Sequence, residues 1–165
     1  MSFEELYDKY FSRIYNYILY RVSSPDMADD IVSRVFEKIL DKYDDFDPAK
    51  ADIQIWLFTI ARNTLMDHYR RQKIRGNFST SGMEDLLQSP DSVEKTVEIK
   101  DLGDRVLKAM EKLSEKERDI IALKFTGEMT NRAIAQSTGL SESNIGVILF
   151  RAMKNLKGLL GPEAI

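Results

Sequence analysis

The sequence predicts an all-α fold of two small helical domains joined by a flexible acidic linker. Apolar residues recur every three or four positions through both halves, and no strand-like alternation competes with this helical spacing. Residues 76–101 lack that period, hold two lysines and six acidic residues, and are rich in Gly, Ser, Thr and Pro. We therefore expect domains at 1–75 and 102–165, which need not pack against each other.

Three helices are predicted in the first domain. The first covers 3–22, where apolar and aromatic side chains keep to one face over several turns. A serine cap followed by Pro25 opens the second helix, and the acidic run before Pro48 breaks it, since proline disfavours helix at the preceding residue. A loop over 46–52 leads to a third helix that begins near Ile53.

The third predicted helix carries basic and polar residues beside aromatic ones. Cationic side chains bind phosphates and aromatic rings stack on unpaired bases, so this combination makes a candidate nucleic-acid interface. The alternative is a solvated helix face beside a buried tryptophan. The residues concerned, with one lysine from the preceding loop, are Lys50, Trp56, Arg62, Asn63, Asp67, His68, Arg70, Arg71 and Lys73.

The second domain is predicted to end in a helix-turn-helix. A helix over 102–113 precedes a capping box that begins at Ser114 and opens the next helix. Thr130 and Ser141 are expected to cap the last two helices, and Gly139 supplies the positive φ of the turn between them.

The spacing within this last pair of helices is typical of DNA-binding proteins. Ala135 is a small residue where the helices cross, Gly139 lies four positions on, and the β-branched Ile145 follows six further. The alternative is an ordinary helical hairpin in an α domain.

The composition argues against an enzyme. The chain has no cysteine and one histidine, His68, which leaves no cysteine nucleophile and no thiolate or histidine-built metal site. No glycine-rich phosphate loop is present, and acidic pairs such as Asp29-Asp30 are more often solvated or partner-facing than Mg²⁺ ligands. We therefore expect no metal, no cofactor and no catalytic residues.

Two further features concern location and charge. No apolar run reaches the length of a membrane span, and the first ten residues are too acidic and polar for a signal peptide, which predicts a cytoplasmic protein without membrane insertion. The net charge of −3 is unusual for a nucleic-acid binder, but the acidity is concentrated in the linker.

Longer stretches of the chain carry a family resemblance. The N-terminal half contains ADDIVSRVFEKIL (28–40) and FDPAKADIQIWLFTIARNTLMDHYRRQK (46–73), and the second of these holds the pattern WL…IARN…D..R. In the C-terminal half, LSEKERDIIALKF (113–125) precedes the helix-turn-helix. In this order and spacing, the halves resemble region 2, a bundle of three or four helices, and region 4 of the extracytoplasmic-function (ECF) group of sigma-70-type RNA polymerase sigma factors.

The resemblance implies a non-enzymatic subunit that directs promoter-specific transcription initiation. Its partners would be promoter DNA, core RNA polymerase at the β′ clamp and the β flap, and an anti-sigma factor. Charged groups beside an exposed apolar position suit a protein interface, and we expect such a position on the second helix. The residues that match polymerase-binding positions of the family are Asp29, Asp30, Ser33, Arg34, Phe36 and Glu37.

The resemblance also assigns two promoter elements. Region 2 would melt and read the −10 element with the basic and aromatic face of the third helix, where capture of an extruded base offsets the cost of unstacking. Region 4 would dock the −35 element in the major groove. The residues expected at the −35 element are Thr130, Arg132, Ser141, Ser143, Asn144, Val147, Arg151 and Lys154.

Two departures from the family pattern keep alternatives open. Ser33-Arg34 stands where the family usually has Gln-Glu, and Gly146-Val147-Ile148 stands where it often has Lys-Ser-Arg. Small and apolar side chains cannot make bidentate contacts to guanine, so indirect readout of DNA shape becomes more important. The alternatives are a stand-alone helix-turn-helix regulator and a polymerase-binding adaptor whose helix-turn-helix does not touch DNA.

Overall fold

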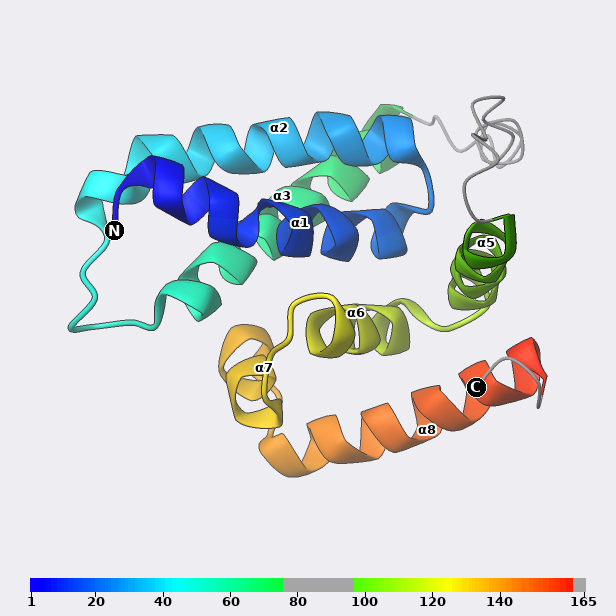
Figure 1. Ribbon diagram of the computed structural model, residues 1–165. Coiled ribbons are helices and arrows are strands. Elements are labelled where there is room, and N and C mark those ends of the chain that lie inside the picture. The colour runs from blue at the N-terminus through cyan, green and yellow to red at the C-terminus, as the bar shows by residue number, and fades with distance from the viewer. Residues whose placement is uncertain (76–96, 162–165) are drawn as a thin grey trace.

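The computed structural model describes residues 1–75 and 97–161, which form helices joined by short loops and confirm the all-α prediction (Figure 1). The N-terminal half consists of α1 (Phe3–Val22), α2 (Pro25–Lys42), a short 3-10 helix η1 (Tyr43–Asp45) and α3 (Ile53–Arg75). The C-terminal half consists of α5 (Val97–Glu111), α6 (Glu115–Phe125), α7 (Asn131–Thr138) and α8 (Glu142–Leu160). Most of the predicted linker lies outside the described residues.

The helix boundaries follow from the capping residues that the sequence predicted. The side chains of Ser114, Thr130 and Ser141 each accept a hydrogen bond from the backbone N–H three residues on, which satisfies a donor that the first helical turn leaves free. Gly139 ends α7 with φ at 79°, a conformation that glycine adopts without steric cost. The helix expected over 102–113 begins earlier, at Val97.

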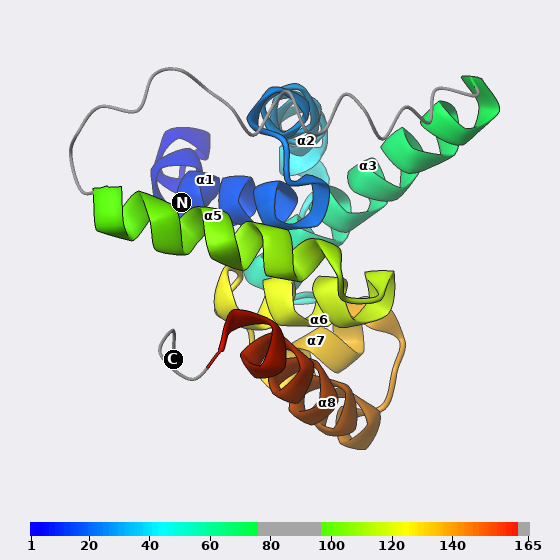
Figure 2. The same cartoon turned by 90° about the vertical axis from the view of Figure 1, so that its right-hand side faces the viewer.

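The three N-terminal helices bury the apolar stripes that periodicity predicted. Ile14 and Ile18 of α1 are fully buried with Ile31 and Ile39 of α2 and Leu65 of α3. The last turns of α3 extend away from the other helices, which leaves their side chains in solvent (Figure 2).

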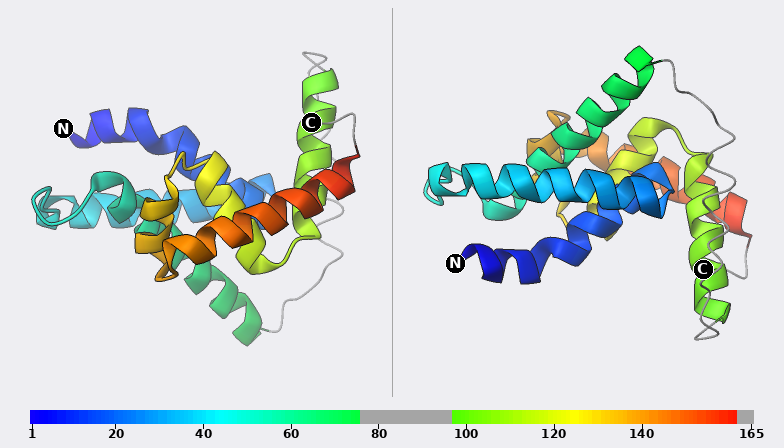
Figure 3. Two further views of the ribbon diagram at one scale, coloured as in Figure 1. Left: turned by 90° about the horizontal axis from the view of Figure 1, so that it is seen from below. Right: turned by 90° about the horizontal axis from the view of Figure 1, so that it is seen from above.

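In the C-terminal half, α8 packs against α5, α6 and α7. Seen from below, α8 lies along the lower face of the molecule, with α7 at one end and α5 near the other (Figure 3). Met110, Ile121 and Ala152 form a small core between α5, α6 and α8. Ile134 and Ile145 are fully buried, as expected for the crossing helices of a helix-turn-helix.

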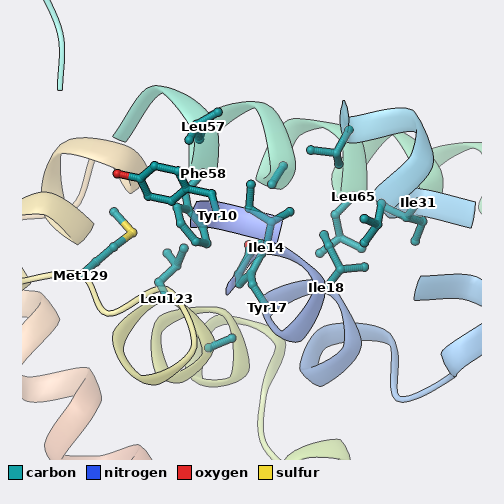
Figure 4. Close-up of a cluster of buried hydrophobic side chains, with 14 of the residues drawn as sticks. Tyr10, Ile14, Tyr17, Ile18, Ile31, Leu57, Phe58, Leu65, Leu123 and Met129 are labelled. Atoms are coloured by element: carbon teal, nitrogen blue, oxygen red, sulfur yellow. The ribbon is translucent and has the colours of Figure 1, made fainter. Parts of the chain in front are cut away.

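The two halves share one hydrophobic core, although the sequence left them free to stand apart. Helix α6 packs against α1, and α7 packs against α3. Leu123 and Met129 from the C-terminal half lie beside Tyr10 and Phe58 from the N-terminal half (Figure 4). Periodicity identifies the buried face of a helix but not the element that covers it, so this packing was outside the reach of the sequence.

Phe58→Ala should lower the free energy of unfolding of the whole chain by about 3–5 kcal/mol. The Phe58 ring is fully buried, and a Cβ placed on Gly127 of the C-terminal half would lie 3.2 Å from it. The measurement is urea unfolding followed by circular dichroism and by the fluorescence of Trp56, the single tryptophan. Both probes should report one midpoint in the unsubstituted chain.

Ile74→Ala is the matched control, because the Ile74 side chain is 80% exposed and its removal should change stability by less than about 0.5 kcal/mol. Two separate urea transitions, or a Phe58→Ala effect confined to one half, would contradict the shared core.

Candidate functional site

The loop before α3 presents an aromatic pair at the start of the predicted nucleic-acid face. The rings of Phe46 and Trp56 have centroids 4.8 Å apart, and Trp56 is half-buried. The carboxylate of Asp47 accepts a hydrogen bond from the backbone N–H of Ala49, which fixes the turn that carries the exposed Lys50. The loop therefore presents an exposed lysine between the two residues of the aromatic pair in the sequence.

Further along α3 the predicted face is exposed and basic. Asp67 is the acidic member of this face, and it lies 3.6 Å from Lys38 of α2 and 3.4 Å from Arg70. Its charge is therefore matched within the N-terminal half. The exposed members of the face on α3 are Asn63, Arg70, Arg71 and Lys73.

His68 does not add to this positive charge. Burial against α2 lowers the pKa of His68, and the nearby charge of Arg34 lowers it further. The imidazole is therefore neutral at pH 7, and its Nε2 atom is buried with no hydrogen-bond partner among the described residues.

Arg62 faces the C-terminal half. Its Nε atom donates to Oδ2 of Asp119 on α6 at 2.8 Å. The other carboxylate oxygen of Asp119 accepts from the guanidinium of Arg21 at 2.7 Å and from the hydroxyl of Tyr17 at 2.6 Å. Burial and the Asp119 charge hold the pKa of Tyr17 well above its usual value, so its hydroxyl remains a donor.

The sequence prediction did not include Tyr17, Arg21 and Asp119. A usable signal was present, because Asp119 immediately precedes the apolar run that begins at Ile120, and Arg21 lies four residues after Tyr17 among buried positions of α1. Polar residues inside apolar stripes are usually paired when buried, but the sequence could not show which residues pair.

The helix-turn-helix presents its predicted DNA edge to solvent. Thr130 and Ser141 use their hydroxyl oxygens as caps, and their hydroxyl protons remain available to an acceptor. Phe150 of α8 is 72% exposed, and the sequence prediction did not include it. All the residues expected at the −35 element are exposed: Thr130, Arg132, Ser141, Ser143, Asn144, Val147, Arg151 and Lys154.

The surface of α2 differs from the prediction at one position. Phe36 was expected to be the exposed apolar residue, but it is buried against the ring of Tyr7, whose centroid lies 4.9 Å away. Leu40, one helical turn on, is 57% exposed and takes that place. The other predicted residues of this surface are exposed or half-buried: Asp29, Asp30, Ser33, Arg34 and Glu37.

A groove of about 510 Å³ runs between α1 and α2 beside these residues. We call it the aromatic groove, because one face of α1 contributes a ladder of rings to it, while α2 contributes carboxylates at its edge. Its lining residues are Phe3, Tyr7, Phe11, Tyr15, Asp29, Val32, Ser33, Phe36, Glu37 and Leu40.

Neither a metal site nor a membrane-spanning helix is found in the described residues. In residues 1–75 and 97–161, no group of three or more His, Cys, Asp and Glu residues is placed to hold a metal ion. Within the same residues, no helix has the length and apolar character needed to cross a membrane.

His68 should titrate below its usual pKa of 6.5, because burial and the Arg34 charge favour the neutral ring. A folded-state pKa below the unfolded one gives stability that is present above pH 6.5 and is lost as the pH falls through the folded pKa. NMR titration measures this pKa without ambiguity, since the chain has one histidine.

Arg34→Gln should raise the pKa of His68 toward 6.5, because it removes a nearby positive charge. Lys9→Gln, an exposed change on α1, is the control and should leave the titration unchanged. A titration of His68 at or above 6.5 in the unsubstituted chain would contradict the burial argument.

Comparisons with known proteins cover both halves. Sigma-70 region 2 matches residues 6–75, and Sigma-70, region 4 matches residues 103–156. RNA polymerase sigma factor YlaC of Bacillus subtilis is 30% identical over 94% of this chain and 90% of its own length. ECF RNA polymerase sigma factor BldN of Streptomyces coelicolor is 30% identical over 99% of this chain, and the chain spans 62% of that relative's length.

Solved structures share the fold along nearly the whole chain. The sigma factor RpoE of Bartonella quintana, in complex with the anti-sigma factor NepR, has a TM-score of 0.70 at 23% identity, with 96% of each chain covered. CnrH, in complex with the cytosolic domain of CnrY, has a TM-score of 0.68 at 24% identity, with 96% of this chain and 86% of that chain covered. With both sigma regions matched in order, and with relatives such as YlaC aligned over almost their full length, this chain belongs to the ECF group of sigma-70-type RNA polymerase sigma factors and functions in promoter-specific initiation of transcription.

Proposed function

We propose that this sigma factor performs its function with four surfaces, two for core polymerase and one for each promoter element. The observation that carries the proposal is the exposure of the helix-turn-helix edge and of the α3 face on different sides of a shared core. In this proposal the domain of residues 1–75 binds polymerase and the −10 element, and the domain of residues 102–165 binds the −35 element.

The polymerase surface is assigned to α2 and the aromatic groove. An exposed apolar residue, Leu40, lies about one helical turn after Glu37 and lines the same groove as Asp29, and the ring ladder of α1 continues the apolar area. A helix of the β′ clamp with apolar and basic side chains would fit this combination. On the opposite half, Phe125 and Phe150 are exposed beside lysines of α6 and α8, and we assign this area to the β flap.

The −10 surface is assigned to the α3 face and the loop before it. Trp56 lies beside the tilted ring of Phe46, Asn63 offers an amide that can pair with a base edge, and the exposed arginines and lysines follow the DNA backbone. A base that leaves the duplex loses its stacking energy, and a pocket with an aromatic ring and an amide offsets that loss.

The −35 surface is assigned to the N-terminal ends of α7 and α8. Ser143 and Asn144 are the side chains on α8 that can hydrogen-bond base edges, and Val147 can contact a thymine methyl group. Arg132, Arg151 and other cations bind phosphates and fix the register. Few base contacts are available, so the shape of the −35 DNA contributes to specificity.

The exposed Phe150 favours a second candidate function. A large apolar side chain on the DNA-binding helix is unusual at a polar DNA interface and suits a protein partner. In this alternative the chain is an adaptor that binds polymerase while its helix-turn-helix contacts protein.

The likeness to structures solved with anti-sigma factors supports a further partner. RpoE was solved in complex with the anti-sigma factor NepR, and this chain has the same fold along 96% of its length. We infer that an anti-sigma factor also binds this chain, that the chain acts in the cytoplasm where its polymerase is found, and that it has no catalytic activity of its own.

Run-off transcription on genomic fragments tests the proposed function. Core RNA polymerase with the purified chain should produce discrete promoter-dependent transcripts that core polymerase alone does not produce. Leu40→Asp should weaken binding to core polymerase, because it places a charge on the apolar part of the α2 surface. A chain that neither co-purifies with core polymerase nor directs any transcript would overturn the proposal.

Trp56→Ala and Asn63→Ala should each reduce promoter opening by on the order of tenfold, which corresponds to loss of about one base-stacking or base-pairing contact. Permanganate reactivity of unpaired thymines in the promoter measures opening, and co-purification measures binding to polymerase, which should change little. Asn16→Ala, an exposed asparagine on α1, is the matched control. Equal loss of opening and of polymerase binding would indicate unfolding and would contradict the assignment.

A further inference from the structure

We propose that Arg21, Arg62 and the Tyr17 hydroxyl form a binding site for a phosphodiester of single-stranded promoter DNA, and that the Asp119 carboxylate occupies this site while the two halves are packed together. The inference rests on the proposed role of α3 at the −10 element. It adds two residues of α1 that no sequence pattern assigned to DNA.

The three donors are arranged around a small anion. Arg62 donates to one oxygen of Asp119 at 2.8 Å, and Arg21 and Tyr17 donate to the other at 2.7 Å and 2.6 Å. A carboxylate and a phosphodiester both carry one negative charge on two oxygens, and guanidinium groups bind either of them. The geometry that holds Asp119 therefore suits a backbone phosphate.

All three donors belong to the N-terminal half, and the acceptor belongs to the C-terminal half. Arg21 and Tyr17 lie one turn apart on α1, with the Arg21 guanidinium 3.1 Å from the Tyr17 oxygen, while Arg62 lies on α3. Separation of α6 from α1 would therefore leave the donors together and remove their anion. Two neighbouring guanidinium groups without a counter-charge attract an anion strongly.

The position of the site matches the path of a DNA strand across α3. Arg62 immediately precedes Asn63, which is exposed and is assigned to an unpaired base. The two side chains point about 100° apart around α3, so a strand whose base reaches Asn63 would pass the Arg62 guanidinium where its backbone runs toward α1. Arg21 is 2% exposed while the two halves are packed together, and after their separation it would bind the same phosphate from the α1 side.

Competition between Asp119 and DNA has a measurable consequence. The apparent affinity of a protein for a ligand equals the affinity of the open site multiplied by the fraction of molecules that have the site open. The free chain should therefore bind single-stranded DNA weakly, and removal of the Asp119 charge should strengthen binding.

Fluorescence anisotropy with a labelled single-stranded DNA of about 12 nucleotides tests the proposal on the full chain. At one fixed salt concentration, Asp119→Asn should bind on the order of tenfold more tightly than the unsubstituted chain, or about 1.4 kcal/mol. Asp8→Asn, which removes an exposed acid of α1 that does not line the cavity around Arg21, Arg62 and Asp119, controls for the change in net charge. A gain no larger than that of Asp8→Asn would overturn the proposal.

A second pair of variants assigns the gain to Arg21. Adding Arg21→Gln to Asp119→Asn should abolish most of the gain, whereas adding Lys9→Gln, an exposed lysine on the same helix, should not. A gain that survives the loss of Arg21 would overturn its role. Circular dichroism establishes that each variant is folded.

Energy transfer between two dyes tests the proposal without changing Asp119, and it therefore applies even if Asp119→Asn does not fold. The chain contains no cysteine, so Asp41→Cys on α2 and Gly158→Cys on α8 can carry two dyes at exposed positions. Saturating single-stranded DNA should lower energy transfer between the dyes, because the strand and α6 compete for the same guanidinium groups. Constant energy transfer during DNA binding would overturn the proposal.

The outcome is separable from that of the proposed function. Failure of the chain to direct any transcript with core polymerase would rule out the proposed sigma function itself. Normal transcription together with an unchanged DNA affinity for Asp119→Asn would rule out the proposed phosphate site and would leave the proposed sigma function supported.

Discussion

The carboxylate of Asp119 is the electrostatic contact on which the arrangement of the two halves depends. It is buried, and its charge is compensated by the guanidinium groups of Arg21 and Arg62. A buried charge that loses its partner costs about 3–5 kcal/mol. If the halves moved apart only partly, Asp119 would lose some of its hydrogen bonds before water could solvate its carboxylate. We therefore expect the halves to be either fully packed or fully separated at this contact.

The rest of the interface between the halves combines apolar and polar contacts. Leu123 and Met129 complete a core begun by α1 and α3, and the carbonyl of Gly127 accepts hydrogen bonds from Arg13 and Gln54. Interfaces of this mixed character between domains are often reversible. A reversible contact suits a protein whose halves are proposed to bind different promoter elements, because each half would then have to act when the other is elsewhere.

The exposed surfaces have different chemical characters that suit the partners proposed for them. The α2 surface and the aromatic groove are apolar and acidic, which suits a protein, whereas the α3 face is basic and aromatic, which suits an unpaired strand. The helix-turn-helix is a well-formed scaffold, and the side chains proposed to hydrogen-bond base edges are limited to Ser143 and Asn144. Phe150 adds an exposed apolar side chain to the helix that carries the proposed DNA edge.

The sequence by itself determined the helices, their caps and the family. Ser114, Thr130 and Ser141 act within one helical turn, so local hydrogen bonding fixes their roles without knowledge of the fold. The sequence could not determine that α6 covers α1, that Phe36 rather than Leu40 is the covered residue of α2, or that Arg62 pairs with Asp119, because these contacts join residues distant in the chain. Only tertiary packing decides which of several equally patterned faces is covered, and therefore which predicted site residues are free to bind.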